Sequence, residues 1–397
     1  MTSADPGKAY DVVIVGGGVM GCAVGFFLAE DPDFDGRVLV VERDPSYSEC
    51  ATTRSWGGIR QQFSTRENIE MSLFGVGFYR EAAERLAAEG DAPALGFREQ
   101  GYLFLASAEG RPVLAANHRL QRSLEAAVQW LEPDALAARF PWLGLEGVAA
   151  GVLGTANEGW IDPSALLHGF RRKARSLGVD FLADEVVGLE REGARIARVR
   201  LAGGGTVACG ALVNAAGPQA GALARLAGLE LPVAPRKRMT YVFDCRSDLA
   251  KAPLTIDPSG VAFRPESGQY MAIVSPPEDQ DPDCADLEPD YTIFEDTIWP
   301  VLAKRVPAFE AIKLTGAWAG HYDYNAFDQN AVIGGHPELE GFYFCNGFSG
   351  HGIQQAPASG RAIAELIVHG RFVSLDLSAF AYERIPAGRP LREANVV

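Results

Sequence analysis

The chain has 397 residues, of which 47% are hydrophobic and 22% are charged, and its formal net charge is −15. This length is typical of two domains. The acidic charge excludes the broad basic surface of a nucleic-acid-binding protein, and an anionic substrate would have to be bound by local cations.

Location and metal content are predicted from what the sequence lacks. Its first residues, MTSADPGKAYD, do not contain the basic and apolar regions of a signal peptide. No apolar run reaches the roughly 18 residues of a membrane span. The six cysteines and six histidines do not show the spacing of metal ligands. We therefore predict a cytoplasmic protein with reduced thiols, no membrane span and no metal.

The first motif joins two strands and a helix. YDVVIV (10–15) predicts a buried strand, GGGVMG (16–21) follows it, and apolar residues at helical spacing come next. RVLVVE (37–42) predicts the second strand, and its last residue, Glu42, is suited to bind a ribose diol. This context predicts a site for NAD or FAD, because a glutamate would repel the 2′-phosphate of NADP.

Each glycine of this motif has its own physical role. Gly16 permits a tight turn, Gly18 lets the backbone approach a pyrophosphate, and Gly21 lets the helix and strand pack closely. The start of the helix adds unpaired N–H groups and a positive dipole end, which favour phosphate.

A polar segment then favours FAD over NAD. ECATTRSWGGIRQQFS (49–64) carries Arg54 and Arg60 where a simple NAD domain would continue with a plain helix and strand. Such a detour is suited to cover a larger cofactor. Ser64 and Glu67 form an S-x-x-E pattern that predicts a capped helix start.

Two glycine-bearing turns follow later in the chain. TVACGALVNAAGPQAGALA (206–224) predicts a strand that ends in a tight turn, and FYFCNGFSGHG (342–352) predicts a strand and turn before a helix over 352–368. Ser349 and His351 do not form a hydrolase pair, because GFSGH departs from the G-x-S-x-G pattern.

The middle of the chain predicts an antiparallel sheet. Its strands are PRKRMTYVFDC (235–245), VAFRPES (261–267) and QYMAIVSP (269–276). REGARI (191–196) predicts a hairpin, and 288–306 predicts a helix that Pro300 kinks or breaks. The acidic, proline-rich segment 276–290 is expected to be a solvated loop, with a lid as the alternative.

Four stretches resemble one known family. They are VVIVGGGVMG (12–21), TTRSWGGIRQQF (52–63), VNAAGP (213–218) and YFCNGFSGHGIQQAPASGRAIAELI (343–367). The chain resembles the D-amino-acid-oxidase-type FAD oxidoreductases, in the branch of sarcosine oxidases, glycine oxidases, and sarcosine and dimethylglycine dehydrogenases. It also resembles the FAD-dependent oxidoreductase-domain proteins linked to respiratory complex I assembly.

This resemblance implies an α/β fold with two domains. A discontinuous, Rossmann-like FAD-binding domain is expected to comprise 1–90, 150–228 and 328–397. An α+β substrate-binding domain built on the antiparallel sheet is expected to comprise 91–149 and 229–327.

The resemblance also implies that the late turn meets the flavin ring, where a helix start stabilises the negative charge of the reduced flavin. FAD is expected to be noncovalent, because Gly320 and His321 precede Tyr322 where a tethering cysteine would stand, and no histidine lies near Trp56. The implied cofactor-binding residues are Gly16, Gly18, Val19, Met20, Gly21, Glu42, Arg43, Thr53, Arg54, Ser55, Gly57, Gly58, Val187, Ala216, Gly217, Gly347, Gly350, His351, Gly352, Ile353 and Gln354.

The implied reaction oxidises the C–N bond of a secondary or tertiary (N-substituted) amino acid, with hydride transfer to flavin N5 and then hydrolysis of the imine. Arg60 would bind the substrate carboxylate, since its planar fork forms paired hydrogen bonds. The alternative is that Arg60 binds phosphate or a surface acid. Gln354 stands where sarcosine oxidases carry a lysine, and the other implied catalytic residues are His351, Tyr322 and His321.

Aromatic side chains are expected to form the wall of the substrate pocket, because they exclude water and can hold a cationic amine. The candidates are Trp56, Tyr241, Phe263, Trp318 and Tyr322.

Several alternatives stay open at this point. The electron acceptor is either oxygen or an electron-transfer partner, because 268–278 lacks a lysine over the flavin and Lys237 is the nearest in sequence. A 2-hydroxy-acid dehydrogenase, with His321 as its base, is the second enzyme hypothesis. A flavin-binding assembly or scaffold protein is the third hypothesis. The small amino-acid-like substrate is not specified further.

Overall fold

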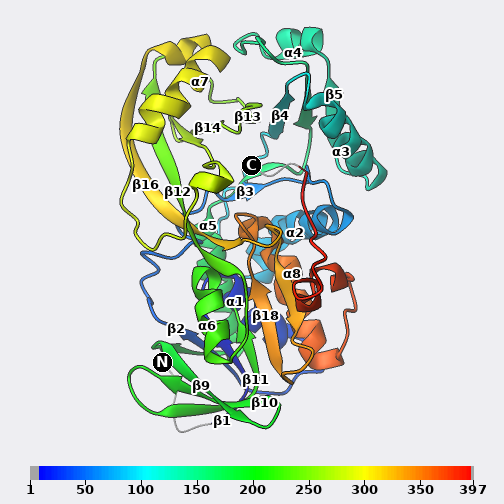
Figure 1. The fold of residues 1–397 in the computed structure, drawn as a ribbon, viewed down its shortest axis with the longest axis vertical. Helices are drawn as coiled ribbons and strands as arrows, with labels where there is room; N and C mark the ends of the chain where they lie inside the picture. The colour runs from blue at the N-terminus through cyan, green and yellow to red at the C-terminus, as the bar shows by residue number, and fades with distance from the viewer. Residues whose placement is uncertain (1–8, 395–397) are drawn as a thin grey trace.

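The computed structural model describes residues 9–394 and contains two large sheets at opposite ends of the molecule (Figure 1). The first sheet has the order β17-β18-β11-β1-β2-β8, and β10 and β9 continue from β11 as a hairpin. Its strands are β1 (Ala9–Val15), β2 (Val38–Glu42), β8 (Asp180–Ala183), β9 (Val186–Glu192), β10 (Arg195–Leu201), β11 (Thr206–Asn214), β17 (Val332–Gly335) and β18 (Phe342–Asn346).

Helices cover both faces of this sheet because its central strands are apolar on both sides. In β1, Val12 and Ile14 pack into one core cluster while Val13 and Val15 pack into another. The first cluster is covered by α1 (Val19–Glu30), α2 (Arg66–Arg85), α5 (Pro163–Ser176) and α8 (Gly352–His369). The second is covered by the short helix α6 (Ala220–Leu226).

The second sheet has the order β16-β12-β15-β14-β13-β4-β6-β5 and is antiparallel except where β13 pairs with β4. Its strands are β4 (Tyr102–Ala106), β5 (Val128–Leu131), β6 (Ala150–Gly154), β12 (Val233–Cys245), β13 (Leu254–Ile256), β14 (Ala262–Glu266), β15 (Gln269–Ile273) and β16 (Ile312–Asn325). A small two-stranded sheet pairs β3 (Gly58–Ile59) with β7 (Gly159–Trp160).

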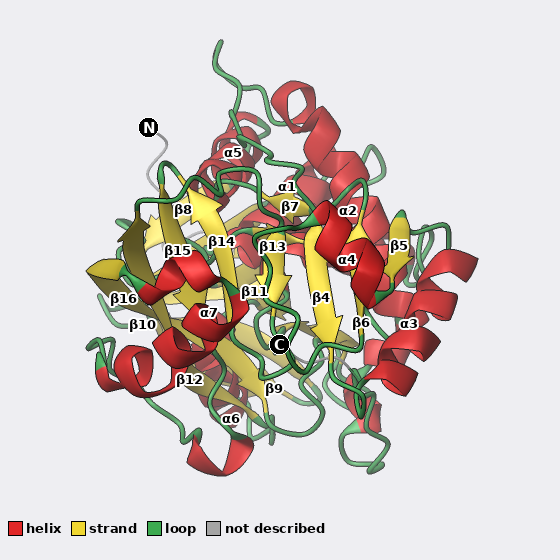
Figure 2. Cartoon of the chain, turned by 90° about the horizontal axis from the view of Figure 1, so that it is seen from above, coloured by secondary structure: helices red, strands yellow, loops and turns green. Residues whose placement is uncertain are grey.

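Strand alternation gives this second sheet an outer and an inner face. Leu103 and Leu105 of β4 pack on the outer side, in a cluster with Leu136 of α4. Tyr102 and Phe104 point the other way. The helices of this part are α3 (Arg111–Ser123), α4 (Pro133–Arg139) and α7 (Trp299–Arg305), and the view from above shows α4 and α7 over the outer face (Figure 2).

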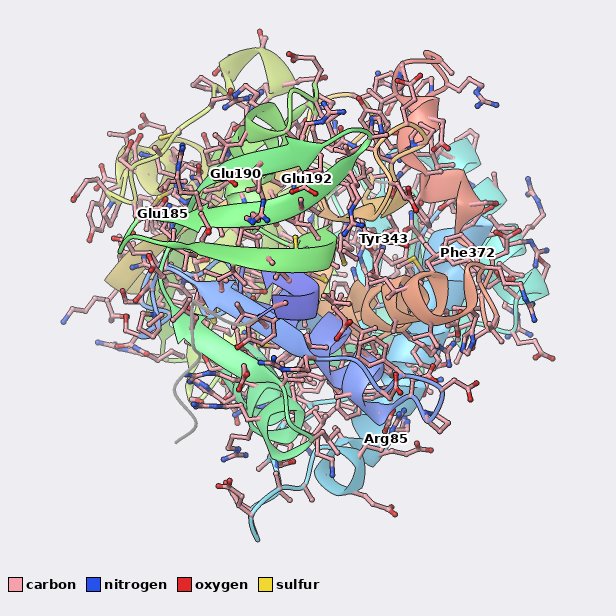
Figure 3. The ribbon with its side chains drawn as sticks, turned by 90° about the horizontal axis from the view of Figure 1, so that it is seen from below. Arg85, Glu185, Glu190, Glu192, Tyr343 and Phe372 are labelled. Atoms are coloured by element: carbon pink, nitrogen blue, oxygen red, sulfur yellow. The ribbon has the colours of Figure 1, made fainter. Side chains whose placement is uncertain are left out.

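The mixed α/β fold is confirmed, as are the predicted strands 235–245, 261–267 and 269–276, which are β12, β14 and β15. The hairpin predicted at 191–196 joins β9 to β10 at the far end of the first sheet, where Glu190 and Glu192 lie (Figure 3). The division into domains stays a prediction; β6 (150–154), which that division assigns to the FAD-binding domain, pairs in the second sheet.

The structure corrects one local prediction and refines two others. The helix predicted from Ser64 begins at Arg66, and the Ser64 hydroxyl instead donates to Glu393 at 2.6 Å. The predicted helix with a kink or break at Pro300 is seen as helical structure that runs from Thr292 through the π-helical stretch Phe294–Ile298 into α7, so the distortion lies directly before Pro300 and the helix does not end there. Most of the segment 276–290 is exposed, as expected of a solvated loop, but Asp281 is 5% exposed and forms two 2.7 Å hydrogen bonds with Arg238.

No helix within residues 9–394 is long and apolar enough to cross a membrane. All six cysteines are free thiols, three of them buried.

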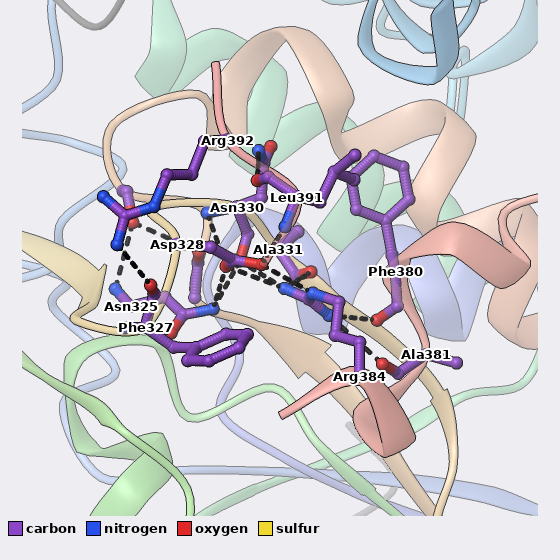
Figure 4. Close-up of polar contacts among 12 residues, drawn as sticks. Asn325, Phe327, Asp328, Asn330, Ala331, Phe380, Ala381, Arg384, Leu391 and Arg392 are labelled. Atoms are coloured by element: carbon purple, nitrogen blue, oxygen red, sulfur yellow. Dashed lines mark hydrogen bonds and ion pairs between the residues drawn. The ribbon is translucent and has the colours of Figure 1, made fainter. Parts of the chain in front are cut away.

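A buried ion pair fixes the end of the described chain (Figure 4). The Asp328 carboxylate, with 0% of its side chain exposed, accepts hydrogen bonds from Arg384 Nε at 2.8 Å and Nη2 at 3.0 Å. It also accepts from the backbone N–H of Leu391 at 2.9 Å. These contacts hold the segment after α8 against the loop that follows β16.

Removing the cation from this pair is expected to destabilise the fold. Arg384→Met leaves the Asp328 carboxylate buried without its partner, so the free energy of unfolding should fall by about 3–5 kcal/mol. Urea unfolding followed by circular dichroism measures the change. The control Arg198→Met breaks an exposed pair with Glu192 and should cost little. Equal losses in both variants would contradict this assignment.

Candidate active site

One cavity of about 640 Å³ is lined by residues from both sheets. This volume lies within the roughly 300–1,000 Å³ of small-molecule sites. Its lining runs from the glycine-rich turn after β1 to the inner face of the second sheet. The cavity is therefore placed to hold a cofactor at one end and a substrate at the other.

The turn after β1 has the geometry that its glycines predict. Gly16 has φ +100°, and a Cβ on it would lie 2.3 Å from the carbonyl oxygen of Ala215. A Cβ on Gly21 would lie 1.9 Å from the carbonyl oxygen of Gly16. Gly18 lines the cavity itself. Gly16 and Gly21 thus allow close packing, while Gly18 leaves the backbone open to a ligand.

The starts of two helices meet at this cavity. Val19 and Met20 of α1 and Gly352 and Ile353 of α8 all line it. A Cβ on Gly352 would lie 3.2 Å from Met20 Cε, so the two helix starts are in contact. The side chain of His351, the N-cap of α8, makes no capping hydrogen bond, and the first N–H of α1, that of Val19, donates to Thr52 Oγ1 at 3.2 Å. Two positive helix ends therefore face one cavity.

Glu42 is fixed at the wall of the cavity by the backbone. Its Oε2 accepts from Gly17 N at 2.7 Å, and its Oε1 accepts from Asp44 N at 2.8 Å. The carboxylate therefore lies beside the glycine-rich turn with a defined orientation, where it can accept from a ribose hydroxyl.

The polar segment 49–64 ties the two sheets together. Arg54 Nη1 donates to the carbonyl oxygen of Ala319 at 2.8 Å, and Trp56 Nε1 donates to Thr240 Oγ1 at 3.0 Å. Both side chains line the cavity. The segment thus forms part of the wall and joins β12 and β16 to it.

Arg60 lines the cavity although its side chain is only 4% exposed. Its Nη1 donates to the carbonyl oxygen of Gln62 at 2.6 Å, and its guanidinium lies 4.2 Å from the ring centroid of Phe63 and 5.3 Å from that of Phe104. Among the residues from 9 to 394, no carboxylate forms an ion pair with it. Arg60 is therefore a buried cation that lacks a direct counter-ion.

His351 is a neutral neighbour of that cation. Its Nε2 lies 3.2 Å from Arg60 Nη2, and it accepts this hydrogen bond because a guanidinium can only donate. Burial, together with the Arg60 charge, lowers the pKa of His351 to about 3. Gln354 is close by, since its Oε1 accepts from the Arg60 backbone N–H at 2.9 Å.

Tyr322 is a buried phenol beside Arg238, whose guanidinium lies 5.0 Å from the centroid of the ring. Burial raises the pKa of Tyr322, although the charges of Arg238 and Arg60 act in the opposite direction, so the phenol is neutral. His321 also lines the cavity, but its Nε2 lies 3.1 Å from the carbonyl oxygen of Asp286 in the segment 276–290.

The cavity brings all five predicted catalytic residues together with most of the predicted cofactor-binding residues. Those cofactor residues are Gly16, Gly18, Val19, Met20, Glu42, Arg43, Arg54, Ser55, Gly58, Val187, Ala216, Gly217, Gly350, His351, Gly352, Ile353 and Gln354. Gly21, Thr53, Gly57 and Gly347 lie outside its lining. Gly57 instead packs where a Cβ would lie 2.1 Å from the carbonyl oxygen of Ile161.

The aromatic wall differs from the prediction. Trp56 and Tyr322 line the cavity, but Tyr241 and Phe263 belong to the core of the second sheet, and Trp318 Nε1 donates to the Arg54 carbonyl oxygen. The sequence reading missed other lining residues, namely Tyr102, Arg238 and Asp323. For these three, only the pairing of distant strands brings them to the site.

Comparison with known proteins agrees with this geometry. The family model described as FAD dependent oxidoreductase matches residues 11–366. The chain belongs to the DAO family of FAD-dependent oxidoreductases. FAD is therefore its cofactor. The glycine-rich turn and the start of α1 fit that cofactor's phosphates, and Glu42 fits its ribose.

Individual relatives cover nearly the whole chain. FAD-dependent oxidoreductase domain-containing protein 1 of Xenopus laevis is 44% identical over 99% of this chain and 86% of its own length. Glycine oxidase of Bacillus licheniformis is 27% identical over 95% of this chain and 98% of its own length. The structure of L-proline dehydrogenase from P. horikoshii has a TM-score of 0.84 and 26% identity, over 97% of this chain and 100% of that one.

Replacing Glu42 is expected to weaken FAD binding. Glu42→Gln keeps the shape of the side chain but removes the charged acceptor, so the Kd of the apoprotein for FAD should rise about tenfold, as expected for a lost charge-assisted hydrogen bond. Quenching of FAD fluorescence measures the Kd. Glu190→Gln, on the exposed hairpin, should leave it unchanged. An unchanged Kd in Glu42→Gln would show that Glu42 does not bind the cofactor.

Proposed function

We propose that this enzyme oxidises the C–N bond of a secondary or tertiary amino acid and that Arg60 binds the substrate carboxylate. The observation that carries this proposal is the buried Arg60 guanidinium, which lines the cavity without an ion-pair partner among residues 9–394. Burying such a cation is costly unless an anion pairs with it. A substrate carboxylate would supply that anion.

The surroundings of Arg60 suit the alkyl part of such a substrate. Apolar side chains line this end of the cavity from four neighbouring strands and the polar segment; they are Trp56, Tyr102, Leu254, Ile256, Ala262 and Ile273. Tyr102 and Ile256 also pack in one apolar cluster with Phe104, on which Arg60 stacks. These walls would exclude water and orient the C–H bond that reacts.

FAD supplies the two-electron acceptor when it is bound. The protein's own contribution is to bind, orient and adjust charge. The Arg60 charge disfavours another positive charge nearby, which would lower the pKa of the bound amine and favour its neutral form. Neutral His351 and neutral Tyr322 add polar contacts without adding charge. We also propose that FAD is noncovalent. Cys50, the cysteine in the cavity lining, lies by Gly18 at the glycine-rich turn, which is the phosphate end of the proposed cofactor site and not the flavin end.

The relatives support an amine over a hydroxy acid. Glycine and L-proline, named for two of the similar proteins, are amino acids, and proline is a secondary amine. A 2-hydroxy acid would need a base near its hydroxyl group. His351 is a poor base with its lowered pKa, and His321 is engaged with Asp286. The oxidation of an amine does not need such a base once the amine is neutral.

Anaerobic reduction of the bound flavin tests this proposal. We expect the flavin absorbance to bleach with at least one of sarcosine, dimethylglycine, proline and iminodiacetate. In Arg60→Met the bleaching rate at low substrate should fall by about 10–100-fold, as expected for the loss of a hydrogen bond to a charged group. The flavin content should be unchanged. Arg60→Lys, which keeps the charge without the planar fork, should be intermediate.

Other outcomes would overturn it. Bleaching by 2-hydroxyglutarate and not by the amines would support the hydroxy-acid hypothesis. An absence of bleaching by every compound would support a flavin-binding assembly or scaffold protein. Admission of air after bleaching then distinguishes oxygen from an electron-transfer acceptor by the rate of reoxidation.

A further inference from the structure

Glu158, between β6 and β7, is a fully buried carboxylate behind Arg60. Its side chain is 0% exposed and lies outside the cavity lining. Its Oε1 accepts from the Gln61 backbone N–H at 2.7 Å, and its Oε2 accepts from Gln62 Nε2 at 2.8 Å. A Cβ on Gly154 would lie 1.9 Å from Glu158 Oε2, so that glycine makes room for the carboxylate.

These contacts connect Glu158 to the position of Arg60. The carbonyl oxygen of Gln62 accepts from Arg60 Nη1, and Gln62 Nε2 also donates to the carbonyl oxygen of Tyr102 at 3.1 Å. Glu158 thus holds the backbone of Gln61 and the side chain of Gln62, the residues that follow Arg60. The guanidinium is placed by a segment that this one carboxylate fixes.

Five titratable groups face Arg60, each from a different part of the chain. They are Tyr102 of β4, Glu158 before β7, Tyr322 of β16, His351 before α8 and Glu393 near the end of the described chain. Burial raises the pKa of both tyrosines and lowers that of His351, so all three side chains are neutral at ordinary pH. Glu393 accepts hydrogen bonds from Ser64 and Asn68.

Glu158 titrates near neutral pH, unlike the two tyrosines and His351. Burial raises the pKa of Glu158 to about 7, although the hydrogen bonds from Gln62 and Gln61 and the Arg60 charge act in the opposite direction. Its charge therefore changes in the pH range in which an enzyme of this kind works, while the carboxylate stays hidden from the cavity.

We propose that Glu158 is a positioning residue for Arg60 and that its ionisation controls how strongly the site binds a substrate carboxylate. This inference rests on the proposed function, in which Arg60 binds that carboxylate. When Glu158 is ionised, it shares the Arg60 charge and repels the incoming anion. When Glu158 is protonated, the full Arg60 charge acts on the ligand.

The sign of the pH effect follows from linkage. A bound anion near Glu158 favours the protonated form, so ligand binding takes up a proton when the pH lies near the pKa of this group. The affinity of the site for a carboxylate should therefore be high below about pH 6 and fall as the pH rises through about 7.

The test measures the Kd of butyrate, which has the shape of sarcosine but no nitrogen to oxidise, from its perturbation of the flavin absorption spectrum. In the FAD-bound protein we expect about tenfold weaker binding at about pH 8.5 than at about pH 5.5, which is one pKa unit of coupling. In Glu158→Gln the Kd should be nearly independent of pH. Gln62 Oε1 has no hydrogen-bond partner in the described chain and could accept from the new amide.

Two further variants serve as controls. Glu365→Gln changes a carboxylate that is 6% exposed and accepts from Val373 N and Ser374 N, far along α8 from the site. Its pH dependence should match that of the unchanged protein. Glu158→Asp keeps a titrating carboxylate and should keep a pH dependence, which provides a test if Glu158→Gln does not fold.

The outcomes separate the two proposals. A wild-type Kd that does not change with pH, or the same pH dependence in Glu158→Gln as in the wild type, would overturn the role of Glu158. Equal butyrate affinity in Arg60→Met and the wild type would instead overturn Arg60 as the carboxylate anchor, and the Glu158 inference would fall with it.

Discussion

The close contact between α1 and α8 is the constraint on which the site depends. A Cβ on Gly360 would lie 2.7 Å from Ala23 Cβ, so this glycine lets the two helices approach. The contact continues to their C-terminal ends, where His369 Nε2 lies 3.3 Å from Asp31 Oδ2. Because the helices are parallel neighbours, their N-terminal ends open on the same cavity. Segments from opposite ends of the chain thereby build one cofactor site.

At the substrate end of the cavity, the site depends on a buried cation, Arg60, which forms no ion pair with a carboxylate among residues 9–394. Arg60 is buried against Phe63 and Phe104 and bonded to a neutral histidine. Glu158, a carboxylate whose pKa burial raises to about 7, is behind the segment that carries Arg60. Buried polar networks of this kind fix geometry and amplify small changes of charge. The site can thus be both rigid and sensitive to pH.

Local sequence patterns were sufficient for much of the fold. The glycine-rich turn, the late helix and the strands of the second sheet each have a signal within a few residues. Glu158 and Arg238 could not be placed in this way, because only the pairing of distant strands brings them to Arg60 and Tyr322. The same limit explains two contacts that the sequence could not predict: the Ser64 hydroxyl donates to Glu393 instead of capping a helix, and Asp281 pairs with Arg238 within a mostly exposed loop.

A crystal structure of the FAD-bound protein with butyrate most directly tests whether Arg60 binds the substrate carboxylate. We expect a flavin between the starts of α1 and α8 and the second sheet, with the butyrate carboxylate within hydrogen-bonding distance of the Arg60 guanidinium. A carboxylate bound elsewhere in the cavity, with Arg60 contacting only His351 and Gln62, would contradict it.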